Sequence, residues 1–298
     1  MQTFLPYEDF QRSAECLDSP RLGKQRVETL QILRALELPE YGWANHPAVR
    51  MWRGFTPALV LYGLICARAW TRRGHADTTQ AQIAEFAPEV IAVDQADLRA
   101  RGLLPPWLGD ERVHESHRSK LVTKDPDYYR PQFAGTPAGL DYFWPPPPSD
   151  ASPGAETAGP SLWIVRTEST QVTGYFVAEG VVALGTDAGI EVDVSGRELP
   201  DLQALVGGRR RTSKPLLALA RFVADVQVGD EVGILIARDR AVLTGTVTGP
   251  YQFDPKAAHG LVHQRAVRWQ SVIDRSAASP PASLRDVRPV FRVRLAAP

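Results

Sequence analysis

The stretch LDSPRLGKQRVETLQIL, residues 17–33, organises the N-terminal half of the chain, because it predicts the first long helix. Ser19 followed by Pro20 is typical of a helix start: serine caps the first turn, and proline has no amide hydrogen to leave unpaired there. The leucines that follow recur at three- and four-residue spacing, which indicates one buried face. A second, polar face carries Arg21, Lys24, Gln25 and Glu28, and Arg26 sits beside the buried edge.

This polar face has two interpretations that the residues alone leave open. One is that it is a solvated surface with internal ion pairs, such as Lys24 with Glu28, each contributing about a few tenths of a kcal/mol. The other interpretation is that this face contacts phosphate groups, with the acid Asp18 at its N-terminal end.

The periodicity of apolar residues changes along the chain. Helical spacing continues through residues 57–73 and 79–86, whereas residues after 160 form short β-branched runs such as LWIVR, VVALG, EVGILIA, AVLTGTVTG and VFRVRL. A single helix, at about residues 213–223, interrupts these runs. The Pro/Ala/Gly/Ser-rich stretch between the halves is typical of a linker. We therefore expect a multidomain α+β chain: an all-α domain over 1–145, a linker over 146–160, and a small β-barrel or sandwich over 161–298.

Composition limits the classes of function. Lys plus Arg and Asp plus Glu both number 34, so a nucleic-acid partner requires a local basic surface. No apolar run reaches the about 18 residues of a membrane span, and the first residues lack the features of a secretory signal. The two cysteines, Cys16 and Cys66, are too few for a disulfide framework. We expect a cytoplasmic protein with buried free thiols.

Two further clusters mix cations with aromatic rings, a combination that suits nucleic acid because rings stack on bases and cations contact phosphates. The first lies around NHPAVRMWRG and offers Asn45, His46, Arg50 and Arg53. The second follows residue 113 and offers Arg118, Lys120, Lys124, Tyr128, Tyr129 and Arg130. For each, the alternative is buried rings with surface cations. His114 and His117 lack the further ligands of a metal site, so we expect no metal and no other cofactor.

Several motifs in order give the N-terminal half a resemblance to a known family: LDSPRLGKQRVE, NHPAVRMWRG, PPWLGDE, SHRSKLVTKDP and YFWP. They resemble the bacterial branch of the pyrimidine-dimer DNA glycosylases, whose founding member is the phage endonuclease V type of glycosylase/AP lyase. The resemblance implies a DNA substrate, double-stranded with a modified or damaged base. It also implies that the clusters above contact DNA.

The resemblance further implies a nucleophile and an acid. In that family the N-terminal α-amine attacks C1′ of the damaged nucleotide, and a nearby carboxylate stabilises the cationic intermediate and transfers protons. Here Gln2 is bulky, so Met1 is expected to be retained and its amine would serve. Asp18 matches the position of the acid, although the family has Glu there, and Glu28 is the reserve acid. A monofunctional mechanism, in which Asp18 acts without a covalent intermediate, stays open.

The C-terminal half resembles another kind of domain through LWIVRTEST, VGDEVGI and TGTVTGPYQFDP. It looks like the reader domains of restriction-system proteins, related to the PUA/EVE superfamily of small β-barrels. Such domains hold a flipped base between aromatic walls. The implied reader residues are Trp163, Arg166, Tyr251, Phe253 and Trp269, with Arg209, Arg210 and Arg211 near phosphate. The alternative for each ring is a place in the barrel core.

Together these features favour a DNA glycosylase, with or without AP-lyase activity, in repair or in defence against modified foreign DNA. The alternative is a non-catalytic reader of modified DNA or RNA. A nuclease is disfavoured because it would need metal, and the sequence shows no ordered carboxylate cluster.

Overall fold

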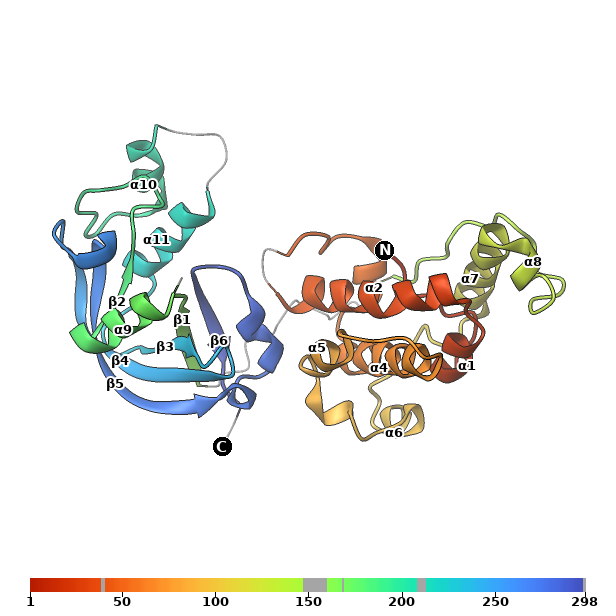
Figure 1. Ribbon diagram of the computed structural model, residues 1–298. Helices are drawn as coiled ribbons and strands as arrows, with labels where there is room; N and C mark the ends of the chain where they lie inside the picture. The colour runs from red at the N-terminus through yellow and green to blue at the C-terminus, as the bar shows by residue number, and fades with distance from the viewer. Residues whose placement is uncertain (39–40, 147–159, 168, 208–212, 297–298) are drawn as a thin grey trace. The chain divides into compact units, whose positions relative to one another are not determined.

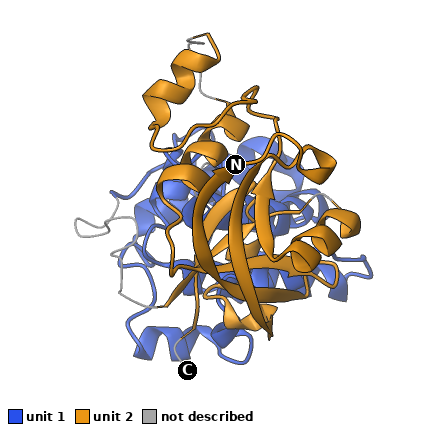
Figure 2. Cartoon of the chain, turned by 90° about the vertical axis from the view of Figure 1, so that its left-hand side faces the viewer, with its two compact units in different colours: residues 1–157 blue, residues 158–298 orange. Residues whose placement is uncertain are grey.

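The computed structural model describes residues 1–38, 41–146, 160–167, 169–207 and 213–296. The chain divides into two compact units, Met1–Thr157 and Ala158–Pro298, coloured separately in Figure 2. The predicted linker over 146–160 lies almost entirely outside the described residues, as do Arg209, Arg210 and Arg211. Among the described residues no helix has both the length and the apolar character needed to cross a membrane.

The first unit is helical (Figure 1). Its helices are α1 (Phe10–Glu15), α2 (Ser19–Glu37), α3 (Pro47–Arg50), α4 (Thr56–Arg72), α5 (Gln80–Ala84), η1 (Pro88–Val90), α6 (Gln95–Ala100), α7 (Glu111–Lys124) and α8 (Pro126–Tyr129). The two long helices α2 and α4 pack against each other and form the centre of the unit.

Close packing of α4 against α2 depends on a glycine. A Cβ at Gly63 would lie 2.6 Å from the side chain of Thr29 on α2, a distance that no unstrained pair of carbons allows. Only a residue without a side chain lets the two helices approach this closely. The apolar face of α2 that the sequence predicts is the face that is buried here, through Leu22, Leu30 and Leu33.

The start of α2 differs by one residue from the prediction. Asp18, and not Ser19, is the N-cap: its Oδ1 accepts a hydrogen bond of 2.8 Å from the backbone N–H of Arg21. Ser19 and Pro20 form the first turn, where proline costs no hydrogen bond. Because Asp and Ser are both good N-cap residues, the sequence could not separate the two.

The second unit is built on a six-stranded mixed sheet with the order β2-β5-β4-β3-β1-β6. Its strands are β1 (Ser161–Val165), β2 (Val181–Leu184), β3 (Glu231–Ile236), β4 (Ala241–Phe253), β5 (His263–Asp274) and β6 (Val290–Arg294). Strands β1 and β3 pair in parallel, and the other pairs are antiparallel. The helices are α9 (Thr170–Glu179), α10 (Leu199–Leu205) and α11 (Lys214–Ala224), with short turns η2 (Ala258–Gly260), η3 (Arg275–Ala277) and η4 (Pro281–Arg285).

The α+β class agrees with the prediction, but a closed barrel is not confirmed. Strands β2 and β6 lie at opposite ends of the strand order and do not pair within the described residues, so the sheet is open there. The expectation of a single helix in this half was wrong, because α9 and α10 accompany α11. Helix α9 covers a segment, TQVTGYFVAE, whose β-branched and aromatic residues favour a strand by propensity alone.

Candidate active site

The first five residues are held in place by buried polar side chains of the helices around them. The amide of Phe4 donates to Gln25 Oε1 at 2.7 Å, and the amide of Leu5 donates to His117 Nδ1 at 3.0 Å. The hydroxyl of Tyr62 donates to the carbonyl of Phe4 at 2.8 Å. Backbone groups buried without such partners would destabilise the fold, so this network determines where the N-terminal amine lies.

The amine of Met1 lies beside a carboxylate in the middle of α2. Its nitrogen is 3.9 Å from Glu28 Oε1, and the side chains of Met1 and Glu28 are 7% and 22% exposed. The other oxygen, Oε2, accepts the amide of Gln2 at 3.2 Å. The pair is therefore largely shielded from water, and part of the Glu28 side chain stays exposed.

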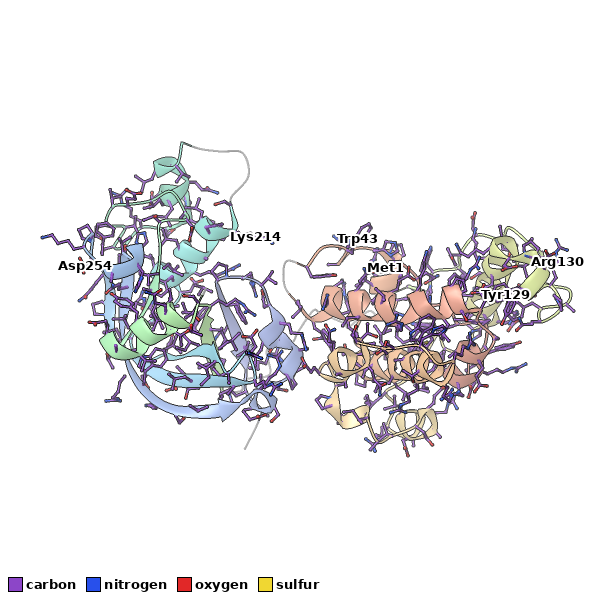
Figure 3. All side chains as sticks on the ribbon, viewed as in Figure 1. Met1, Trp43, Tyr129, Arg130, Lys214 and Asp254 are labelled. Carbon is purple, nitrogen blue, oxygen red and sulfur yellow. The ribbon has the colours of Figure 1, made fainter. Side chains whose placement is uncertain are left out.

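Asp18 occupies a different position. Glu28 lies roughly three helical turns further along α2, which is about 15 Å at the ordinary helical rise. The Asp18 carboxylate caps the helix and accepts a bond of 2.5 Å from Arg21 Nη1, and its amide donates to the hydroxyl of Tyr129 at 3.0 Å. Figure 3 shows Tyr129 at the beginning of α2 and Met1 near its middle. The expectation that Asp18 is the acid nearest the amine is therefore corrected: the reserve acid Glu28 holds that position.

His46 completes a group of three around the amine. It is the N-cap of α3, and its Nδ1 accepts the amide of Ala48 at 3.1 Å. Burial and the nearby positive amine lower the pKa of His46, and Glu28 acts in the opposite direction. The ring is thus favoured in its neutral form, and with Nδ1 accepting a hydrogen bond, its proton lies on Nε2.

Three aromatic rings that the sequence analysis did not select surround this group. The ring of His46 makes edge contacts with Trp43 and Trp144, at centroid distances of 5.7 and 6.2 Å. Tyr142 lies 5.2 Å from Trp144, and its pKa is raised to about 12 by burial and then by Glu28. The motif YFWP contains Tyr142 and Trp144 and was the available signal for these two rings, but it supported only the resemblance.

Several predicted DNA contacts have other partners. Gln25 is fully buried and binds the N-terminal segment, and Tyr129 is buried against α2, so neither faces a ligand. Arg26 forms an ion pair with Asp77 at 2.7 Å. Arg118 donates a hydrogen bond of 2.9 Å to the carbonyl of Pro6 and forms an ion pair with Glu111. These corrections share one cause, because long polar side chains satisfy buried carbonyls and carboxylates before they face solvent.

Other predicted contacts are available to a ligand. Lys24, Asn45, Arg50, Tyr128 and Arg130 are exposed. Arg53 is half-buried and donates weakly to the carbonyl of Ala44, and Lys120 is 3.5 Å from Asp141. Lys24 forms no ion pair with Glu28 in the part of the chain that the structure describes. The internal pairing considered for this face is therefore absent there.

The two histidines considered for a metal serve the fold. His114 Nδ1 lies 2.8 Å from the carbonyl of Leu5, and its Nε2 accepts the amide of Gly109 at 3.0 Å. Burial lowers the pKa of His117 to about 3. Within the described ranges, no three His, Cys, Asp or Glu side chains gather in a way that could hold a metal ion.

In the second unit the predicted aromatic walls lie in the core. Trp163 is 8% exposed and donates to Asp230 Oδ2 at 3.1 Å, and Trp269 donates to the carbonyl of Phe176 at 2.9 Å. The hydroxyl of Tyr251 lies 2.8 Å from His263 Nδ1. Phe253 packs against the same cluster. Trp163 and Tyr251 are buried and Phe253 and Trp269 are partly buried in this core, so the four rings do not form one exposed cage, although Tyr251 also lines a small cavity of about 230 Å³.

The remaining predicted reader residue, Arg166, lines a cavity of about 570 Å³ in this unit. Its guanidinium donates to the carbonyls of Asp286 and Leu284. The walls also include Phe176 and Leu219, with Asp187 and His259 among the polar residues. The alternation of the strands indicated a core but could not place this cavity, because it forms between α9, β2, α11 and four connecting segments.

Comparison with protein families agrees with this division into two parts. Residues 162–281 match the model of a domain of unknown function. No curated protein and no solved structure matches the chain significantly. Residues 1–83, which contain the amine, Glu28 and His46, match the model of the pyrimidine dimer DNA glycosylase family, and over this segment the chain is similar to enzymes that act on damaged DNA.

Proposed function

We propose that the chain is a DNA glycosylase with AP-lyase activity, and that the amine of Met1 is its nucleophile. The observation that carries the proposal is the amine itself, 3.9 Å from Glu28 Oε1 and near His46. The match of residues 1–83 to the pyrimidine dimer glycosylase family supports the same chemistry.

The mechanism needs a neutral amine, a leaving base and a proton acceptor. The amine attacks C1′ of the damaged nucleotide, the bond from C1′ to the base breaks, and the base leaves with the electron pair and takes up a proton. Loss of one proton from the attached nitrogen, and opening of the sugar ring with O4′ taking up a proton, leave a cationic Schiff base at C1′. Removal of a proton from C2′ then expels the 3′ phosphate and cuts the strand.

Glu28 fits the role of the carboxylate in this sequence. Its negative charge beside the amine stabilises the cationic Schiff base, and the oxygen that faces Met1 can accept a proton. Neutral His46, with its proton on Nε2, can donate to the departing base or exchange protons with the amine. Asp18 does not fit, because its two oxygens already accept hydrogen bonds from Arg21.

Borohydride trapping tests the proposal directly. The full chain is produced as a fusion whose cleavage liberates Met1 as first residue, and the uncleaved fusion is the matched control. With DNA containing an abasic site, borohydride should reduce the Schiff base to a stable adduct in the cleaved protein only. Mass analysis of the digested adduct should place the DNA on Met1.

Two other outcomes would redirect the proposal. Base release without any adduct would indicate the monofunctional mechanism. Binding to modified DNA without base release would favour the alternative, a non-catalytic reader. A panel of duplexes with pyrimidine dimers, oxidised bases or modified cytosines identifies the substrate by the base released, and so separates repair from defence against modified foreign DNA.

For the second unit we propose a reader function, with the cavity lined by Arg166 as the site in place of the aromatic cage. Its apolar floor suits a planar ring, and Asp187 forms no hydrogen bond or ion pair among the described residues, so its carboxylate can accept from an amino group on that ring. In the full chain, Asp187→Asn should weaken binding to the preferred modified duplex. It should leave trapping at an abasic site unchanged. If Asp187→Asn reduced binding to the modified duplex and trapping at an abasic site equally, the second unit would not contain a separate reading site.

A further inference from the structure

An exposed tryptophan, Trp43, contacts the ring of His46 and has a strained backbone conformation. Trp43 is 65% exposed, the largest fraction for any Trp, Tyr or Phe side chain in the described residues. Its backbone φ is 79°, in the left-handed region that a bulky side chain rarely adopts. A large ring held in water on a strained backbone costs stability twice, so the fold itself does not explain it.

The surroundings of Trp43 connect it to the candidate active site. Its carbonyl accepts the amide of His46 at 2.8 Å, which closes the turn that leads into α3. Its ring meets the edge of the His46 ring at 5.7 Å and an angle of 68°. The pKa of His46 is lowered by burial and by the Met1 amine and is raised by Glu28, so both charges act on the His46 ring. Figure 3 labels Trp43 and Met1 on the same side of α2.

The other side of His46 is also aromatic. Trp144 meets the His46 ring at 6.2 Å and nearly at right angles, and Tyr142 packs on Trp144. His46 is thus fixed between two indoles that come from segments about a hundred residues apart in the chain. No ring other than His46 contacts the Trp43 ring among the described residues.

We propose that Trp43 is a stacking platform for a nucleobase at the reacting nucleotide, positioned by His46 and Trp144 so that the base and C1′ are held at the amine. This inference rests on the proposed function and adds a specificity-determining residue to it. Stacking suits the geometry because an indole that is mostly exposed and contacts only one other ring has π-surface free for a base. It also gives a reason for keeping a tryptophan at a positive φ, because such strain persists where a function requires the residue.

Equilibrium binding of the full chain tests the inference, with a duplex whose reacting nucleotide keeps its base, carries a 2′-fluoro group that blocks base release, and is followed by 2-aminopurine. Trp43→Gly removes the ring and suits the positive φ, and Trp43→Phe keeps a smaller ring. Ile91→Ala, another exposed apolar residue, is the matched control. We expect Trp43→Gly to weaken binding about tenfold and to alter the change in 2-aminopurine emission on binding. Trp43→Phe should lose less, and Ile91→Ala should bind like the wild type.

The thermal midpoint separates stacking from a structural role. Trp43→Gly should not lower the midpoint, because the ring is exposed and glycine relieves the strain. Affinity and emission that stay within twofold of the wild type in Trp43→Gly would overturn the inference while leaving the proposed function intact. Failure of the wild type to bind or trap DNA would overturn the proposed function, and the inference with it.

Discussion

The two carboxylates of α2 differ in what their oxygens do. Asp18, at the start of the helix, accepts the amide of Arg21 with one oxygen and its guanidinium with the other. Glu28, in the middle, accepts the backbone amide of Gln2 and the side-chain amide of Gln25 with one oxygen and turns the other toward the Met1 amine. A carboxylate whose acceptors are occupied by its own helix stabilises the fold, whereas one that faces an amine and is partly open to solvent remains available for chemistry.

The largest expected effect is on catalysis at Glu28. Glu28→Gln keeps the size of the side chain and its acceptor for the amide of Gln2, but removes the charge that faces the amine. We expect base release and strand cleavage to fall about 100-fold or more, with trapping reduced in parallel, as is typical when a general acid or base is lost. Initial rates on abasic and damaged duplexes measure this, and Asp18→Asn is the matched control on the same helix. Normal rates for Glu28→Gln would refute the assignment of the acid.

The next effect is a loss of folding stability at acid pH. It comes from His117, whose ring holds the N-terminal segment that carries the amine. Burial lowers the pKa of His117 to about 3, below the about 6.5 of an exposed histidine, so the unfolded chain binds a proton that the folded chain excludes. The stability from neutral His117 is complete above pH 6.5 and is lost as the pH falls toward 3. The slope for one such group is about 1.4 kcal/mol per pH unit.

Unfolding by urea at pH 7.5 and pH 5 measures this loss, which should reach about 2 kcal/mol from His117. His117 Nδ1 accepts the amide of Leu5 and so holds the first residues in place. Protonation of His117 in the same acid range should therefore also release the N-terminal segment. Hydrogen exchange of the Leu5 amide reports on that release. An exchange rate that does not increase from pH 7.5 to 5, after correction for intrinsic exchange, would contradict the role of His117.

A smaller effect is expected at the other carboxylate. Asp18→Ala removes the N-cap and leaves the Arg21 guanidinium with the carbonyl of Lys124 and the carboxylate of Asp125. We expect the unfolding free energy to fall by about 1 kcal/mol, with trapping at an abasic site retained. Thermal unfolding and trapping are measured on the same preparation. A folded Asp18→Ala protein without trapping would restore Asp18 as the catalytic acid.

The smallest expected effect is on the salt dependence of DNA affinity, measured for two exposed arginines in different parts of the first unit. Arg50 is exposed in α3, the helix that His46 caps, and Arg72 is exposed beside Glu15 at the other side of the unit. Arg50→Ala should reduce the slope of log affinity against log salt by about one, because one phosphate contact is lost. Arg72→Ala should leave the slope unchanged. Fluorescence anisotropy over a salt series measures both, and equal slopes for the two variants would place the DNA elsewhere.

Local features of the fold were predictable where short-range physics decides them. Residues predicted as helix over 57–73 form α4, and the β-branched runs LWIVR and EVGILIA form β1 and β3. Propensity failed for α9, where the N-cap Ser169 and packing of Phe176 into the core outweigh the preference of the β-branched residues for strands. An open or closed sheet cannot be decided from single strands, because closure depends on which edges meet.

By itself, the sequence determined that α2 would be an amphipathic helix with a capped start, and that helices would give way to strands in the second half. Spacing, caps and β-branching act within a few residues, so they are visible in the sequence. Only the tertiary structure decided which carboxylate meets the amine. The amide of Gln2 and Glu28 are 26 residues apart in the chain, and their contact depends on Gln25, Tyr62 and His117 holding the segment between. Such long-range contacts follow from packing, which one helix cannot specify.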